Sequence, residues 1–99
     1  MEPDIAYHFT AVRMSQKQGS EEQQNEYFGN EYYRRFESVL HRLNAVVTSL
    51  KSADGKYFEP YTRAELEKEF HLGGPFNQYT KYPDENMVFS ITINKIIIL

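Results

Sequence analysis

The chain offers three histidines, His8, His41 and His71, as candidates for metal binding or proton transfer. No two of them have the spacing that places paired ligands on one helical turn. His8 falls on the polar side of a predicted strand, His41 on the solvent side of a predicted helix, and His71 at the end of another. We therefore interpret all three as surface side chains. An enzyme that uses His8 or His41 with a carboxylate, in a groove between two copies, remains an alternative.

Other catalytic and cofactor signals are missing from the sequence. The chain has no cysteine, which excludes disulfides, thiolate zinc sites and thiol nucleophiles. Gly73 and Gly74 follow a predicted helix instead of preceding one, so they do not resemble a phosphate-binding loop. The acids of the segment 65–69 alternate with Lys68, as on a solvated helical face. The sequence predicts no metal, no cofactor and no catalytic activity.

A group of basic residues allows a second function. Arg34, Arg35 and Arg42 lie close to tyrosines, and single-strand binders interleave basic and aromatic side chains in this way. The simpler interpretation is that Arg35 and Arg42 lie along the edge of the core and pair with Glu31 or Glu37. The net charge of −3, from 14 acids and 11 bases, also disfavours nucleic acid. Nucleic-acid binding is therefore kept only as an alternative.

Tyrosine is the unusual component of the composition. The chain has eight tyrosines and no tryptophan, and 15% of its residues are aromatic. Tyrosine is enriched in protein interfaces because its ring is apolar and its hydroxyl can form hydrogen bonds. The alternative is that tyrosines cover the rim of a small core. For a binding surface we select the tyrosines outside the predicted core stripe, namely Tyr27, Tyr33, Tyr61, Tyr79 and Tyr82.

Periodicity predicts the elements that carry these residues. Alternation predicts strands at 5–14, 77–82 and 87–99. Apolar residues at steps of three and four predict a long amphipathic helix over 26–51, and a capping box at Thr62 and Glu65 begins a second helix that ends at Leu72. The polar segment 15–24 is expected to be a surface loop or a mobile segment.

These elements predict an α+β fold in a single domain spanning residues 1–99. The predicted order is β-α-α-β-β, with a three-stranded, mostly antiparallel sheet packed on the long helix. We place the last strand centrally because it is the longest and most apolar. Its end, formed by Ile96, Ile97, Ile98 and Leu99, is apolar on both faces. It is buried under the helix, pairs with a second copy to form a homodimer, or adds to the sheet of another protein.

Composition and size limit the location and the function. The first residues lack the pattern of a signal peptide, and the longest apolar run is too short to span a bilayer. Since small secreted domains usually rely on disulfides, we expect a cytoplasmic protein. The leading hypothesis is a small intracellular regulator, inhibitor or adaptor that binds another protein and has no catalytic activity.

Overall fold

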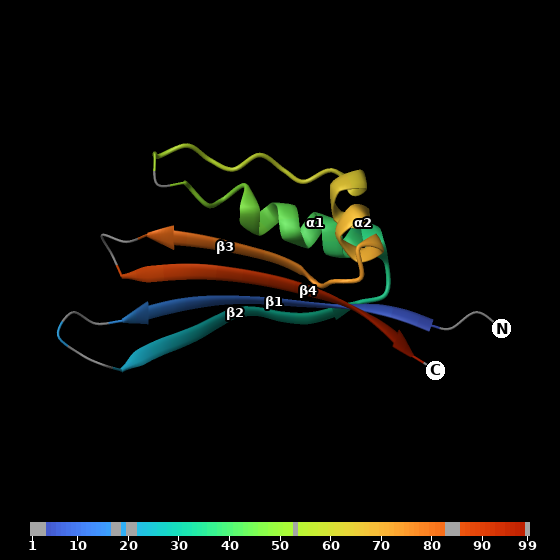
Figure 1. The fold of residues 1–99 in the computed structure, drawn as a ribbon, viewed down its shortest axis with the longest axis horizontal. Coiled ribbons are helices and arrows are strands. Elements are labelled where there is room, and N and C mark those ends of the chain that lie inside the picture. Colours follow the sequence, from blue (N-terminus) through green and yellow to red (C-terminus); the bar gives the residue numbers. More distant parts are fainter. Residues whose placement is uncertain (1–3, 17–18, 20–21, 53, 83–85, 99) are drawn as a thin grey trace.

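The computed structural model describes residues 4–16, 19, 22–52, 54–82 and 86–98. It contains four strands and two helices: β1 (Asp4–Gln16), β2 (Gln23–Tyr33), α1 (Phe36–Val47), α2 (Arg63–His71), β3 (Phe76–Tyr82) and β4 (Met87–Ile98). The strands form one antiparallel sheet in the order β2-β1-β4-β3, and the helices lie on one side of it (Figure 1).

The predicted α+β class is confirmed, and so is the central position of the last strand. The structure also shows that the last strand pairs antiparallel with the first. β4 lies between β1 and β3, and its odd-numbered side chains from Phe89 to Ile93 face the helices, as the alternation predicts. The predicted count of three strands and one long helix is wrong, because a further strand precedes the helices. The observed order is β-β-α-α-β-β.

The predicted helix over 26–51 is the source of this error. Only Phe36–Val47 is helical, whereas the residues up to Tyr33 form β2. Within β2, aromatic residues such as Tyr27, Phe28 and Tyr32 favour a strand, and pairing with β1 supplies hydrogen bonds along its whole length. Aromatic spacing that fits one helical face also fits a strand, so tertiary pairing decided the conformation.

The close approach of β2 to a core side chain, beside a bulge in the strand, explains why a glycine stands at position 29. The register between β1 and β2 shifts beside Ala11, so that Phe28 is an extra residue in the ladder. A Cβ atom at Gly29 would lie 2.8 Å from Cε1 of Phe9, closer than real contacts allow. Gly29 therefore lets β2 approach the ring of Phe9, which is fully buried.

The polar segment 15–24 is less loop-like than predicted. β1 continues through Gln16 and β2 begins at Gln23, so both ends of the segment are strand. Its residues 17, 18, 20 and 21 lie outside the described part of the chain. Gly19 has a φ of 83°, which suits a tight turn between the two strands. The backbone ladder extends farther than the apolar pattern because strand pairing needs no apolar side chain.

The second helix follows its sequence signals. The Thr62 hydroxyl accepts a hydrogen bond from the backbone N–H of Glu65, and the Glu65 carboxylate accepts one from the backbone N–H of Thr62. This is the predicted capping box. Gly73 follows the helix with a φ of 84°, the left-handed conformation that ends many helices. Leu66 is the fully buried residue of α2.

The core lies between the helices and one face of the sheet. Its buried side chains form one cluster that joins Phe9, Ile91 and Ile93 of the sheet to Val39 and Leu43 of α1. The molecule measures 55 × 28 × 21 Å, so the sheet is long compared with the two helices. The helices cover one face of the sheet, and in the described part of the chain no element covers the other (Figure 1).

Candidate functional site

The uncovered side of the sheet is here called the open face. It is formed by the side chains that alternate with those of the core. Its members include His8, Thr10 and Val12 of β1, Tyr27, Asn30 and Tyr32 of β2, Asn77, Tyr79 and Lys81 of β3, and Ser90, Thr92 and Asn94 of β4.

Three tyrosines project from this face. The exposed fractions of Tyr27, Tyr32 and Tyr79 are 65%, 66% and 62%. Tyr27 and Tyr32 come from β2, and Tyr79 comes from β3 at the opposite edge of the sheet. The ring of His8 stacks on Tyr32, with ring centres 4.3 Å apart and an angle of 9° between the planes. Large aromatic rings therefore stand at both edges of a face that carries uncharged polar and aliphatic side chains between them.

Hydrogen bonds between strands hold the polar side chains of the open face. His8 Nε2 donates to Asn30 Oδ1 at 2.7 Å, which fixes the histidine ring against β2. The Thr92 hydroxyl donates to Asn77 Oδ1 at 3.0 Å, which joins β4 to β3. A side chain that is already held loses less rotational entropy when a partner binds. The open face is thus partly organised before any contact is made.

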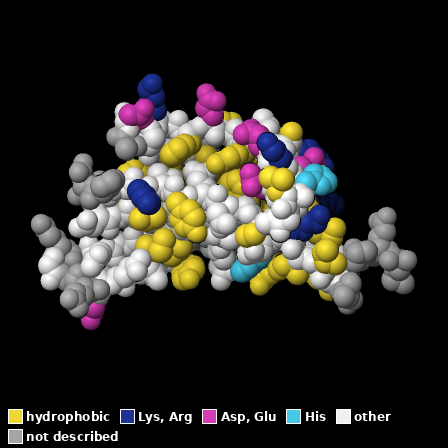
Figure 2. Space-filling model, in the orientation of Figure 1, with side chains coloured by type: hydrophobic (Ala, Val, Ile, Leu, Met, Phe, Trp, Pro, Cys, Tyr) yellow, Lys and Arg dark blue, Asp and Glu magenta, His cyan; other side chains and the backbone are white. Residues whose placement is uncertain are grey.

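Charge is distributed unequally between the two layers. Among its described residues, the open face carries the carboxylate of Asp4 and the ammonium group of Lys81. Acids and bases gather over the upper, helical half of the molecule, whereas the lower half shows mainly hydrophobic and uncharged side chains (Figure 2). Interface centres are depleted of charge in this way, because desolvating a charge is costly.

The five tyrosines selected from the sequence separate into two groups. Tyr27 and Tyr79 lie on the open face, whereas Tyr33, Tyr61 and Tyr82 lie on the helical side of the sheet. The Tyr61 hydroxyl donates to Gln78 Oε1 at 2.7 Å, and its ring packs edge-on against Phe76.

The tyrosines of the second group also contact the backbone and the core. The Tyr82 hydroxyl donates to the carbonyl oxygen of Lys51, and its ring packs edge-on against Phe89. Tyr33 packs against the core cluster. Sequence reasoning missed Tyr32 as a surface residue because it assigned Tyr32 to the core stripe of the long helix. It also left His8 out of any binding surface.

The three arginines do not share one helix, contrary to the prediction. Arg34 and Arg35 precede α1, because the chain up to Tyr33 is strand. Arg42 lies on α1, and its Nε donates to Glu31 Oε1 at 3.0 Å. Arg34 Nη1 lies 3.9 Å from Asp4 Oδ2. The pairing of Arg42 with Glu31 confirms the simpler interpretation for that residue.

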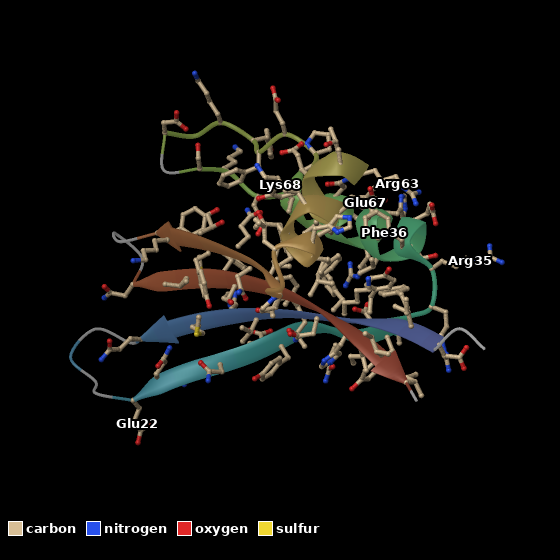
Figure 3. All side chains as sticks on the ribbon, turned by 45° about the vertical axis from the view of Figure 1, so that its right-hand side comes forward. Glu22, Arg35, Phe36, Arg63, Glu67 and Lys68 are labelled. Atoms are coloured by element: carbon tan, nitrogen blue, oxygen red, sulfur yellow. The ribbon has the colours of Figure 1, made fainter. Side chains whose placement is uncertain are left out.

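A small pocket lies where α2 meets the sheet. Its volume is about 280 Å³, and Tyr7, Phe36, Arg63, Glu67, Phe70, His71 and Lys95 line it. Arg63 of α2 lies beside Phe36 of α1 and Glu67 of α2 (Figure 3). Its guanidinium group sits over the Phe36 ring, donates to Glu67 Oε1 at 2.8 Å and pairs with Glu37. With two carboxylate partners, Arg63 links the helices and leaves little positive charge for an anionic ligand.

Protonation in this region follows the same contacts. The hydrogen bond from Arg63 lowers the pKa of the Glu37 carboxyl below its ordinary value. The two glutamates raise the pKa of Arg63, chiefly through their hydrogen bonds. Burial raises the pKa of the Tyr7 hydroxyl. All three changes keep the groups in their ordinary charge states at neutral pH, which suits a structural ion pair better than proton transfer.

The histidines are separated by the fold. His8 lies on the open face, whereas His41 lines a shallow surface pocket with Glu37 on α1, and His71 ends α2. Among the described residues, no three of the types His, Cys, Asp and Glu lie close enough together to hold a metal ion. The described part of the chain also contains no helix that is both long and apolar enough to cross a bilayer.

The C-terminal isoleucines lie at the end of β4. Ile96 is partly buried, and the exposed fractions of Ile97 and Ile98 are 57% and 41%. All three pair with β1 and not with β3, whose ladder ends at Ile93. Leu99 lies outside the described residues.

Comparison with protein-family models, with curated proteins and with solved structures finds no significant match.

Proposed function

We propose that this chain is a small protein-binding module, a regulator, inhibitor or adaptor without catalytic activity, and that its open face docks on another protein. The observation that carries this proposal is the combination of three exposed tyrosines with a nearly uncharged strand surface. Tyrosine, asparagine, serine and threonine supply both apolar contact and adaptable hydrogen bonds, as they do in antibody combining sites.

The size of the open face supports this proposal. At about 3.4 Å per residue and about 4.8 Å between strands, the four strands cover about 700 Å². A specific protein interface buries about 800 Å² on each partner. The open face therefore lies within the range of about 600–1,000 Å² that standard interfaces bury on each partner. The pocket of about 280 Å³ beside Arg63 is at or below the usual size for a small-molecule site.

The chemistry of the open face indicates the kind of partner. Its hydroxyl and amide groups match a partner surface that is uncharged and offers hydrogen-bond donors and acceptors. Nucleic acid is a poorer match, because phosphate binding needs several lysines or arginines and Lys81 is the one that the described open face provides. With no cysteine and no disulfide in the chain, we keep the cytoplasm as the proposed location.

A comparison of capture experiments tests this function. The protein carries an N-terminal tag and is purified from the cells that express it, with and without nuclease. The wild type is compared with a triple variant of the open face, Tyr27→Ser, Tyr32→Ser and Tyr79→Ser. Tyr57→Ser is the matched control, because Tyr57 is 61% exposed but lies in the connection between α1 and α2.

We expect a near-stoichiometric partner that resists nuclease, binds the wild type and the control, and is lost from the triple variant. The purified partner should then bind the wild type and the Tyr57→Ser control with similar affinity and the triple variant much more weakly. A partner that binds the triple variant and the wild type equally would refute the proposal. Capture that depends on nucleic acid would favour the alternative function.

A further inference from the structure

The paired ends of β1 and β4 extend beyond the rest of the sheet. β2 pairs with β1 only as far as Tyr7, and β3 pairs with β4 only as far as Ile93. Residues 4–6 and 96–98 still pair with each other. They form a two-stranded ribbon at the end of the molecule that holds both chain termini (Figure 1). In the described part of the chain, residues 94–98 thus have an outer edge without a strand partner.

Apart from Asp4, this ribbon is apolar on both faces. Ile5 and Ile97 lie on the helical side, and Ala6, Ile96 and Ile98 lie on the other. Ile97 and Ile98 remain largely exposed although they belong to a regular strand. An apolar edge of this kind pairs readily with another strand, since its N–H and C=O groups are available and its side chains gain by burial.

The other edges of the sheet differ from this one. β2 carries a bulge at Phe28 and the acids Glu26 and Glu31, and both devices hinder pairing with another strand. β3 has seven residues, begins after Pro75 and carries Lys81. The edge at 94–98 has neither a bulge nor a proline, and Lys95 is its one charged residue.

Space for an additional strand exists beside this edge. A hollow of about 340 Å³ lies between Gly74 and Pro75 on one side and Asn94 and Ile97 on the other. It begins where the β3 ladder stops. A Cβ atom built at Gly73 or Gly74 would meet nothing within 4 Å, so the chain that leads into β3 does not fill the hollow.

We propose that a second copy of this chain occupies the edge, with the two β4 strands antiparallel about a two-fold axis at Ile97. In this register Ile97 faces Ile97 of the second copy, and Ile96 faces Ile98. Residues opposite each other in a ladder have their side chains on the same face of the sheet. Moving the two-fold axis by one residue changes every pairing by two residues, which keeps this match of faces. Within residues 94–98, this register pairs each isoleucine with an isoleucine. A register centred on Ile96 would instead place Ile97 opposite Lys95 and Ile98 opposite Asn94.

Electrostatics agrees with this register. The two copies of Lys95 would be separated by four residues along the strand, which is about 14 Å at 3.4 Å per residue. That separation exceeds the Debye length of about 8 Å at physiological ionic strength, so their repulsion is screened. The pairing contains no other charge from residues 94–98.

The dimer should be weak, because the ladder that residues 96–98 would form is small compared with specific interfaces of at least about 1,200 Å². The proposed axis is perpendicular to the sheet, so both open faces would lie on the same side of a continuous eight-stranded sheet. The dimer does not depend on the proposed function, and it can be tested without any partner protein.

Cysteine crosslinking tests both the dimer and its register, because the chain has no native cysteine. Directly opposite Cβ atoms lie about 4.5–5.5 Å apart and diagonal ones about 7–8 Å, whereas a disulfide needs about 3.5–4.5 Å. Ile97→Cys should crosslink to itself under mild oxidation. Ile96→Cys and Ile98→Cys should crosslink poorly alone and well when mixed. Tyr57→Cys, with similar exposure far from the ribbon, is the control.

We expect at least about tenfold more dimer from Ile97→Cys than from the control, given these Cβ separations. Sedimentation of the unmodified protein at rising concentration should show a reversible dimer, which Ile97→Lys removes without changing the circular dichroism spectrum. A wild-type protein that stays monomeric at millimolar concentration would overturn the proposal. So would equal crosslinking from Ile97→Cys and Ile98→Cys alone, or crosslinking of Ile97→Cys to a different protein only.

Discussion

The two faces of the sheet differ in burial and in the kind of side chain that they carry. Along β1, Phe9 and Ala11 are fully buried beneath the helices, while His8 and Thr10 stand on the open face. Along β4, Ile91 and Ile93 are buried, while Thr92 and Asn94 face outward. Neighbouring residues of a strand therefore belong to different surfaces, one closed by α1 and α2 and one without cover in the described chain.

This difference separates stability from binding. The covered face holds the apolar side chains whose burial drives folding. The open face holds three exposed tyrosines, whose loss should cost little stability, beside hydroxyl and amide side chains that are largely half-buried. Substitutions on the covered face should thus change the free energy of unfolding, and substitutions on the open face should change the affinity for a partner.

The largest expected effect is at the centre of the core. Phe9→Ala should lower the free energy of unfolding by about 3–5 kcal/mol, because a fully buried ring leaves a cavity. Thr10→Ala, one residue along the same strand, should change it by less than about 1 kcal/mol. Urea unfolding followed by circular dichroism measures both. Equal losses from the two variants would contradict the assignment of faces.

A smaller effect is expected at Gly29. Gly29→Ala should destabilise the protein by about 1–3 kcal/mol, because the new Cβ atom would press on the Phe9 ring. If that contact is the cause, Gly29→Ala should lower the free energy of unfolding by less when the Phe9 ring is replaced by the smaller side chain of Phe9→Leu. A double-mutant cycle in urea measures the coupling. Strictly additive effects of Gly29→Ala and Phe9→Leu would show that contact with the Phe9 ring does not cause the loss of stability.

The tyrosines permit a comparison of matched substitutions on the two sides of the sheet. Tyr61→Phe removes the hydroxyl that donates to Gln78 and should cost about 1 kcal/mol. Tyr79→Phe removes a hydroxyl without a partner in the described chain and should change stability by less than about 0.5 kcal/mol. Thermal unfolding at several urea concentrations resolves these values. A greater loss from Tyr79→Phe would indicate that the open face contributes to the fold.

The smallest effect concerns the link between the helices. Arg63 lowers the pKa of Glu37 in the folded state, so the folded protein binds a proton there less readily than the unfolded chain does. This contribution to stability is present above the ordinary glutamate pKa and disappears as the pH falls through the lowered, folded-state pKa. Glu37→Gln should therefore be less stable than the wild type at pH 7 and equally stable in strong acid, as measured by urea unfolding at a series of pH values. A difference that persists in strong acid would exclude this ion pair as its cause.

Much of the fold could be predicted from local patterns. Alternation placed β1 and β4 with the correct faces, and Thr62 with Glu65 marked the start of α2. The conformation of 26–33 could not be predicted in this way. Its aromatic spacing suits a helix and a strand, and pairing with β1, which is distant information, selects the strand.

That single error also limited the prediction of the site. When β2 was interpreted as helix, Tyr32 appeared to be a core residue and the open face had no fourth strand. Tyr27 and Tyr79 were selected correctly as exposed residues, but nothing in the sequence placed them on one face. Tyr61 was selected with them although its ring is packed against Phe76, because burial of a tyrosine depends on the tertiary fold.

Photo-crosslinking in living cells can show whether the open face binds a partner protein. A benzophenone amino acid replaces Tyr79 in one variant and Tyr57 in another, two positions that are 62% and 61% exposed but lie on the open face and in the helical layer. If the open face docks on another protein, we expect a discrete crosslink to a partner protein from position 79 and none from position 57. A crosslink from position 57 alone, or from neither position, would contradict the assignment of the open face as the binding surface.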